Sequence, residues 1–176
     1  MQNKMLTRMV VRVYEQAETI VEMAHSLIRR RAWVWDGPNR TPLIPRRIGV
    51  VCAHVSQVSA VRERLTGDLS EVFVETADRY QGLERRVMLV YHPLSGRADA
   101  SFFHLDTGRM CVMMSRHSVA CFIFSRGGVE EMLNGYVPSG NRILGIEEDP
   151  EYQGWYSHRQ MMRQLRRLDR AWRVNR

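Results

Sequence analysis

The segment 77–84 places polar and flexible residues between two apolar stretches, 72–76 and 87–91. Both stretches are typical of buried strands, because the first is rich in β-branched and aromatic residues and the second is continuously apolar. Polar groups at the end of a buried sheet are where open α/β folds bind ligands. A solvated loop that turns at its glycine is the alternative. The residues that could do chemistry here are Asp78, Gln81, Gly82 and Glu84.

The net charge of the chain is +7, and its cations are almost all arginine. Lys4 is the only lysine among 26 cationic residues, so 26 − 1 = 25 of them are arginines. The planar guanidinium group binds phosphate oxygens in pairs, so this composition is consistent with a nucleic-acid partner. A coding bias toward arginine is the alternative explanation.

Three segments resemble motifs of superfamily 1 helicases, in the branch similar to the nonsense-mediated-decay helicase. Residues 76–84, TADRYQGLE, resemble motif V, T-x-D-x-x-Q-G-x-E. Residues 108–116, GRMCVMMSR, are similar to motif VI, R-L-N-V-A-L-T-R. Residues 48–57, IGVVCAHVSQ, resemble motif IV, an apolar strand followed by a turn that ends in glutamine. The three occur in the family's order and together cover roughly residues 48–124.

The resemblance implies a role in ATP hydrolysis. In the family, the second arginine of motif VI is an arginine finger, which stabilises negative charge on the transferred phosphoryl group. Carried over, Arg116 is the finger and Arg109 supports it. Glu84 approaches the ribose or its phosphates, Gly82 lets the backbone come close to the nucleotide, and Gln57 lies near the base or ribose. The alternative for Arg116 is a cation that interacts with a helix end.

The same resemblance assigns four residues to a nucleic-acid strand. Thr76 donates to a backbone phosphate, and Asp78 and Gln81 link the nucleotide side to the strand side. His54 lies near a base or ribose. Movement along a strand of any sequence requires phosphate contacts rather than base reading.

A P-loop is absent from the sequence. The pattern G-x-x-x-x-G-K-[ST] needs a lysine after glycine, and Lys4 follows Met1-Gln2-Asn3. The family carries its P-loop on a first RecA-like domain, so we expect this chain to be a piece of a longer helicase or a protein that has lost its partner half. ATP with Mg²⁺ is then held mainly by that first domain. The expected partners are the first RecA-like domain and single-stranded DNA or RNA.

Two functions remain open. The first is the second motor domain of an ATP-dependent helicase, which by itself hydrolyses almost no ATP. The second is a non-catalytic nucleic-acid-binding or regulatory protein derived from such a domain.

The apolar patterns predict an α/β fold with a largely parallel sheet, and the resemblance makes it a three-layer RecA-like domain with helical extensions at both ends. We expect Ser56 to cap the second helix and residues 93–107 to form a long loop. The expected regions are 1–47 (helix and connecting loop), 48–137 (RecA-like core) and 138–176 (basic helical extension). The expected helices are 4–31, 57–65, 108–117, 129–133 and 149–176, and the expected strands are 48–53, 72–76, 87–91 and 119–124, with a small hairpin or loop over 31–47.

Two arginine-rich segments carry alternative interpretations. Residues 149–176 combine an apolar stripe with seven arginines, which favours a helix docked on its own domain over a nucleic-acid surface. A membrane-surface helix is disfavoured, since the stripe is modest. The triplet 29–31 favours a solvated helix end over nucleic-acid contact.

Bulk properties exclude several classes of protein. No apolar run approaches the roughly 20 residues that span a bilayer, so no membrane partner is expected. Cys52, Cys111 and Cys121 lack C-x-x-C spacing and lie among apolar residues. This pattern predicts buried, reduced thiols in a cytoplasmic protein. The histidines show no ligand spacing, so no metal site is expected.

Overall fold

The computed structural model describes residues 13–36, 38–95, 100–125, 127–136 and 149–174. The helices are α1 Val13–Arg29, α2 Val55–Arg62, α3 Phe102–Leu105, α4 Thr107–Ser115, α5 Val129–Gly135 and α6 Pro150–Val174. The strands are β1 Trp33–Asp36, β2 Asn39–Pro42, β3 Ile48–Cys52, β4 Phe73–Thr76, β5 Arg85–Tyr91 and β6 His117–Phe124. The 3₁₀ helices are η1 Pro45–Arg47, η2 Gly67–Leu69 and η3 Ala77–Tyr80. The first residues of the predicted helix 4–31 lie outside the described residues.

Four parallel strands form the central sheet, in the order β4-β3-β5-β6. The whole of β3 and most of β5 are buried, which explains their unbroken apolar sequences. Side chains alternate between two cores, so that Val50 and Leu89 face one core while Val51 and Val90 face the other. The predicted α/β fold with a parallel, RecA-like sheet is confirmed.

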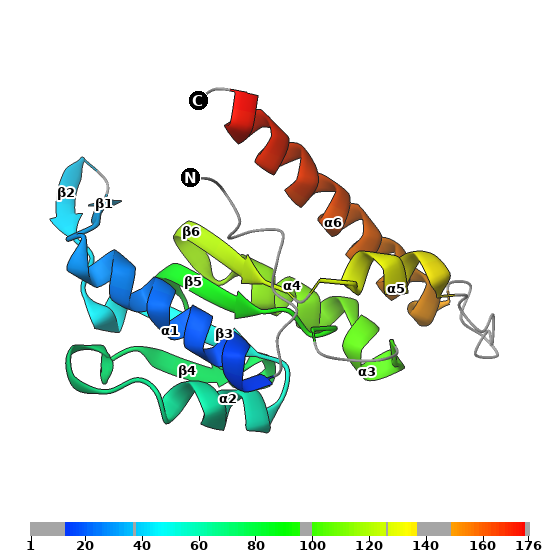
Figure 1. Cartoon of the computed structure of the whole chain (residues 1–176), viewed down its shortest axis with the longest axis horizontal. Coiled ribbons are helices and arrows are strands. Elements are labelled where there is room, and N and C mark those ends of the chain that lie inside the picture. The colour runs from blue at the N-terminus through cyan, green and yellow to red at the C-terminus, as the bar shows by residue number, and fades with distance from the viewer. Residues whose placement is uncertain (1–12, 37, 96–99, 126, 137–148, 175–176) are drawn as a thin grey trace.

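Helical segments cover both faces of the sheet and produce three layers (Figure 1). On one face, α1 and α2 bury Ala17, Ile20 and Val58 against the strands. On the other face, η3 and α4 bury Tyr80 and Met113. The helix α1 therefore belongs to the main core of the domain, while the division of the chain after residues 47 and 137 stays a prediction.

The start of α2 differs from the prediction. The helix begins at Val55, and its N-cap residue is His54 rather than Ser56. The cause is Gln57, whose Oε1 accepts hydrogen bonds from the backbone N–H groups of Ala53 and His54, both at 3.1 Å. This side chain closes the turn earlier than a serine cap would.

Two further predictions need correction. The stretch 93–107 is not a continuous loop, because it contains the short helix α3. The three cysteines are free but differ in burial, since Cys52 is buried, Cys121 is half-buried and Cys111 is exposed. Cys111 lies on α4 next to the buried Met113 but on the side of the helix that faces solvent. The prediction that Cys111 is buried was therefore wrong, because apolar neighbours in the sequence do not all lie on the same side of a helix.

The helix α1 ends in a Schellman motif that carries arginine where glycine is usual. The N–H of Arg31 donates to the carbonyl of Ile28 at 2.9 Å, and the N–H of Ala32 donates to the carbonyl of Leu27 at 3.0 Å. Arg31 has a φ of +49°, and it is the only non-glycine residue in the described part of the chain whose φ is positive. This left-handed conformation costs about 1–2 kcal/mol for a residue with a Cβ atom.

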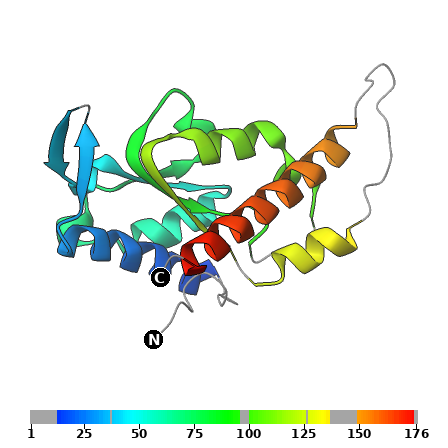
Figure 2. The same cartoon turned by 90° about the horizontal axis from the view of Figure 1, so that it is seen from above.

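The helix α6 docks on α3 and α5, as its amphipathic pattern predicts, and runs obliquely across the domain (Figure 2). The indole Nε1 of Trp155 donates to the carbonyl of Leu133 at 2.6 Å. Gly154 is buried against Leu105, where an added Cβ would overlap the backbone carbonyl. No helix in the described part of the chain, α6 included, has the length and hydropathy needed to cross a membrane.

A pair of buried histidines lies between α6 and the core. The Nε2–H of His158 donates to the carbonyl of His104 at 3.1 Å, and the His158 ring lies 5.3 Å from that of His92. Burial lowers the pKa of His158 to about 4, although the bond to His104 acts in the opposite direction. Burial, together with the nearby His158, also lowers the pKa of His92 well below its ordinary value.

We expect Arg31→Gly to stabilise the domain. Glycine relieves the cost of the left-handed conformation but loses more backbone entropy on folding, which leaves a net gain of roughly 0.5–1 kcal/mol. Urea unfolding gives the difference. The matched control is Arg30→Gly, which has no such strain to relieve and should lower stability by a similar amount. Equal stability of the two variants would contradict this account of the helix end.

We expect the stability of the domain to fall as the pH drops from about 7 to 5. His158 binds a proton in the unfolded chain near its ordinary pKa, but in the folded chain only near pH 4. Acid therefore favours the unfolded chain by about 2 kcal/mol over this range through His158 alone. Urea unfolding at both pH values measures the loss. His158→Gln should reduce this loss.

Candidate functional site

A shallow groove of about 190 Å³ lies between η3 and α4. Three side chains that the motifs single out line it, namely Asp78, Gln81 and Arg109. The remaining lining residues are Ala77, Asp106, Gly108 and Val112. Motif V and the start of motif VI therefore share one concave surface at the carboxyl edge of the sheet.

Arg109 is the most firmly held side chain of this groove. Its Nη2 lies 3.6 Å from Oδ1 of Asp78, and its Nη1 donates to the carbonyl of Phe103 at 2.8 Å. The guanidinium carbon also lies 3.7 Å from the centroid of the Phe103 ring. Only 15% of the Arg109 side chain is exposed, against 71% of Asp78. Arg109 therefore joins α4 to motif V and to α3, while Asp78 keeps most of its surface open to a ligand.

The first turn of α4 has a side-chain cap that the sequence interpretation missed. Asp106 is the N-cap residue, and its Oδ1 accepts a hydrogen bond from the N–H of Arg109 at 2.6 Å. The helix consequently begins at Thr107 rather than at Gly108. An aspartate three residues before Arg109 is the local signal that could have revealed this cap.

His54 does not line the groove, but aromatic contacts connect it to Arg109, which does. Its ring stacks on Phe103 at 5.1 Å, and its Nε2 lies 3.0 Å from Nε2 of His104. Phe103 also contacts the guanidinium group of Arg109. The end of motif IV is therefore connected to motif VI through the Phe103 ring. Gln57, by contrast, is 2% exposed and is used to close the turn before α2. The structure therefore brings His54, but not the Gln57 carbonyl oxygen, toward the groove.

Motif V and α4 lie side by side and run in the same direction from one edge of the sheet to the other. At the carboxyl edge, Asp78 meets Arg109. At the amino edge, the N–H of Arg85 donates to the carbonyl of Arg116 at 3.0 Å. Arg109 and Arg116 are seven residues apart, which places them on the same side of the helix about 10 Å apart along its axis. Glu84 is exposed beside Arg85, so it lies at the Arg116 end.

The Arg116 end carries polar nitrogen atoms that have no partner among the described residues. Arg116 is at the C-cap position of α4, and its buried Nε atom makes no hydrogen bond there. The same is true of Nε of Arg85 and Nδ1 of His117, which are opposite each other in the sheet. Arg85 and Arg116 are only half-buried, so the outer parts of their guanidinium groups reach the surface. Two cationic side chains therefore lie together at this end of α4.

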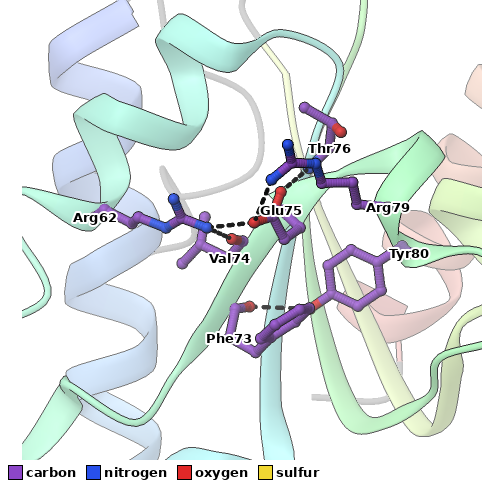
Figure 3. A network of polar contacts seen from close by, with 7 residues as sticks. All are labelled: Arg62, Phe73, Val74, Glu75, Thr76, Arg79 and Tyr80. Carbon is purple, nitrogen blue, oxygen red and sulfur yellow. Dashed lines mark hydrogen bonds and ion pairs between the residues drawn. The ribbon is translucent and has the colours of Figure 1, made fainter.

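The beginning of motif V is fixed by an ion-pair network around Glu75 (Figure 3). Its Oε1 lies 2.5 Å from Nη2 of Arg62 and 3.5 Å from Nη1 of Arg79. Its Oε2 accepts a hydrogen bond from the N–H of Thr76 at 3.3 Å. Burial alone would raise the pKa of Glu75, but the Arg62 and Thr76 hydrogen bonds and the charges of Arg62 and Arg79 lower it overall. A glutamate inside an apolar strand was the sequence signal for this network.

The middle of motif V is anchored by Tyr80. The side chain is fully buried, and its hydroxyl donates to the carbonyl of Phe73 at 2.9 Å (Figure 3). A Cβ added to Gly49 would overlap this hydroxyl, and it would lie 2.7 Å from Sδ of Met88. Gly82 then turns the chain with a φ of +76°, a conformation that glycine adopts without strain. Thr76, at the end of β4, is half-buried where this segment begins.

The described residues contain no group of three or more His, Cys, Asp or Glu side chains arranged to hold a metal ion. A protein-family model described as an AAA domain matches residues 2–127, which is well over half of the chain. The match includes all four strands of the central sheet and the three motif segments. No curated protein matches the chain with significance.

We expect Gly49→Ala to lower the free energy of unfolding by about 1–3 kcal/mol, because the added methyl group overpacks the site occupied by Tyr80 and Met88. Chemical denaturation followed by circular dichroism measures the change. Gly135→Ala is the matched control, since an added Cβ meets nothing within 4 Å there and alanine favours the helix. A Gly49→Ala protein as stable as the control would show that Tyr80 is not confined as described.

Proposed function

Because this chain belongs to the AAA-domain family, the family of C-terminal helicase domains of superfamily 1 helicases, we propose that it is the second motor domain of an ATP-dependent nucleic-acid helicase. We place it in the branch similar to the nonsense-mediated-decay helicase, whose pattern of motif V it carries. The observation that carries this proposal is the parallel arrangement of motif V and α4. Asp78 forms an ion pair with Arg109 at one end, and the N–H of Arg85 donates to the carbonyl of Arg116 at the other.

In this function Arg116 is the arginine finger. The two arginines of motif VI have different surroundings, since Arg109 contacts Asp78 and Phe103 whereas Nε of Arg116 has no partner among the described residues. A guanidinium group that is not neutralised within its own domain can stabilise charge that develops on a phosphoryl group presented by another domain. Arg109 then holds α4 in position, and Arg116 contacts the nucleotide.

The nucleotide is ATP with Mg²⁺, held mainly by a first RecA-like domain that carries the P-loop. This chain has only one lysine, Lys4, and no P-loop pattern. ATP supplies the phosphoryl group that is transferred to water. Gly82 and Glu84, both exposed near the Arg116 end, face the ribose and phosphates. Arg109 supports them indirectly, by holding the other end of α4 against Asp78. Gln57 is left out of this contact, because its Oε1 is bonded to the turn before α2.

The nucleic acid is a single strand that follows the carboxyl edge of the sheet. Asp78 and Gln81 are exposed in the groove, Thr76 begins the segment that leads into it, and His54 extends the same surface through Phe103. The Thr76 hydroxyl and the Gln81 amide can donate hydrogen bonds to the sugar–phosphate backbone, which favours backbone contacts over base edges. The carboxylate of Asp78 is repelled by phosphate, so its role is to hold Arg109 beside the strand. The strand and the nucleotide are therefore linked through one short segment, motif V.

ATPase assays with single-stranded DNA or RNA test this proposal, with the chain alone and mixed with a P-loop-bearing first domain from the same source. We expect activity only in the mixture. Arg116→Ala should reduce kcat at least about a hundredfold, because arginine fingers contribute 10³–10⁵ in rate. Arg116→Lys should recover part of it, since the charge remains without the planar fork.

The control variant is Arg163→Ala, which removes an exposed arginine of α6 and should leave kcat unchanged. A mixture that binds nucleic acid but shows no ATPase activity would contradict the motor-domain proposal. That result would favour the alternative, a non-catalytic nucleic-acid-binding protein derived from such a domain.

A further inference from the structure

The hairpin β1–β2 exposes two tryptophans far from the groove. Trp33 is 51% exposed and Trp35 is 66% exposed. The hairpin projects from the end of the domain opposite α3, beside the carboxyl end of α1 (Figure 1). Large aromatic side chains at this degree of exposure mark an interaction surface when they are grouped.

The alternation of the strand explains why both tryptophans share one face. Val34 lies between them and is 4% exposed, because it packs into the main core. Its neighbours on β1 must therefore point away from the domain. Across the hairpin, Arg40 is opposite Trp35 and Pro42 is opposite Trp33. The guanidinium carbon of Arg40 lies 5.0 Å from the centroid of the Trp33 ring.

The segment around this face is strongly basic. Residues 29–47 contain six arginines and one aspartate, which gives 6 − 1 = +5 within 19 residues of a chain whose total is +7. Arg30, Arg31, Arg40 and Arg46 are exposed. Such a concentration of guanidinium groups beside flat aromatic rings is complementary to a polyanion that also presents flat rings.

The strained residue Arg31 belongs to the same surface. Its φ of +49° favours glycine, yet the position carries a cation directly before the hairpin. Strain at a residue that the backbone alone does not favour is found at functional sites. Keeping an arginine at this turn therefore costs conformational free energy, which is consistent with a role of its charge in binding rather than in folding.

We propose that the β1–β2 face formed by Trp33, Trp35 and Arg40, with Arg30 and Arg31 beside it, binds single-stranded nucleic acid. Unpaired bases stack on the tryptophan rings, and the arginines contact the phosphates. Two residues along a strand place the tryptophans about 7 Å apart, so neighbouring bases of one strand can reach both rings. A single strand is required because the bases of a duplex are already stacked and paired. This contact lies outside motifs IV, V and VI and does not depend on ATP hydrolysis.

Fluorescence anisotropy with labelled dT12 and rU12, in the absence of nucleotide, tests the stacking. The double variant Trp33→Ala, Trp35→Ala should lose at least about tenfold in affinity. The double variant Trp33→Phe, Trp35→Phe should stay within about threefold of the unmodified chain, since phenylalanine also stacks. Trp155→Phe, a change at a half-buried tryptophan of α6, is the matched control and should leave the affinity unchanged.

The salt dependence of the same titration tests the phosphate contacts. Replacing Arg30 and Arg40 by glutamine should reduce the slope of log K against log salt concentration by about 1.4, because each phosphate contact to a single strand contributes about 0.7. Quenching of tryptophan fluorescence by dT12 should be present in the unmodified chain and largely lost in the double Phe variant. Circular dichroism verifies that each variant is folded. This is expected for the changes at Trp33, Trp35, Arg30 and Arg40, because those side chains are exposed.

Affinity of the double Ala variant within twofold of the unmodified chain would overturn the proposal. Light scattering tests whether a second copy of the chain binds this face instead. If the unmodified chain forms a dimer that the double Ala variant does not, while affinity for the oligonucleotides is unchanged, the face binds a second copy and the proposal is wrong. These titrations contain no ATP, so their outcome does not depend on whether the ATPase assay of the proposed motor domain is positive or negative.

Discussion

The packing of Tyr80 over Gly49 is the constraint on which the candidate site depends. The chain has to return from the carboxyl end of β4 to the beginning of β5 across one face of the sheet, and no long helix makes this connection. Tyr80 is the large side chain that anchors it, with its hydroxyl bonded to Phe73 and no space for a Cβ beneath it. Because this residue faces inward, Asp78 and Gln81 face the groove.

The sequence predicted the sheet and the motif segments well. The strands β3 and β5 are buried on both faces, so their sequences are continuously apolar, and this local pattern is enough to identify a buried strand. It predicted caps and contacts between segments poorly. Gln57 looked like a ligand residue, but its Oε1 bonds to the turn before α2. The bridge from His54 through Phe103 to Arg109 joins positions about fifty residues apart, and no local pattern encodes such a contact.

The two ends of α4 place one residue type in two different surroundings. Arg109 is matched by a carboxylate, a carbonyl and an aromatic ring, so its charge is used within the domain. Arg116 lies two turns further along, where Nε has no partner among the described residues. Sequence alone identifies both as motif arginines, whereas the difference between their surroundings follows from Asp78, Phe103 and the position of Arg116 at the helix end.

The contact between Gly154 and Leu105 has an evolutionary consequence. The obstacle to a larger residue at position 154 is a backbone carbonyl, which cannot rotate away as the tip of a side chain can. Drift in the sequence of α6 is therefore constrained at Gly154, as it is at Trp155 and the buried His158, and less so at an exposed arginine such as Arg163. A lineage cannot slide this helix along α3 without losing the close approach that a missing Cβ permits.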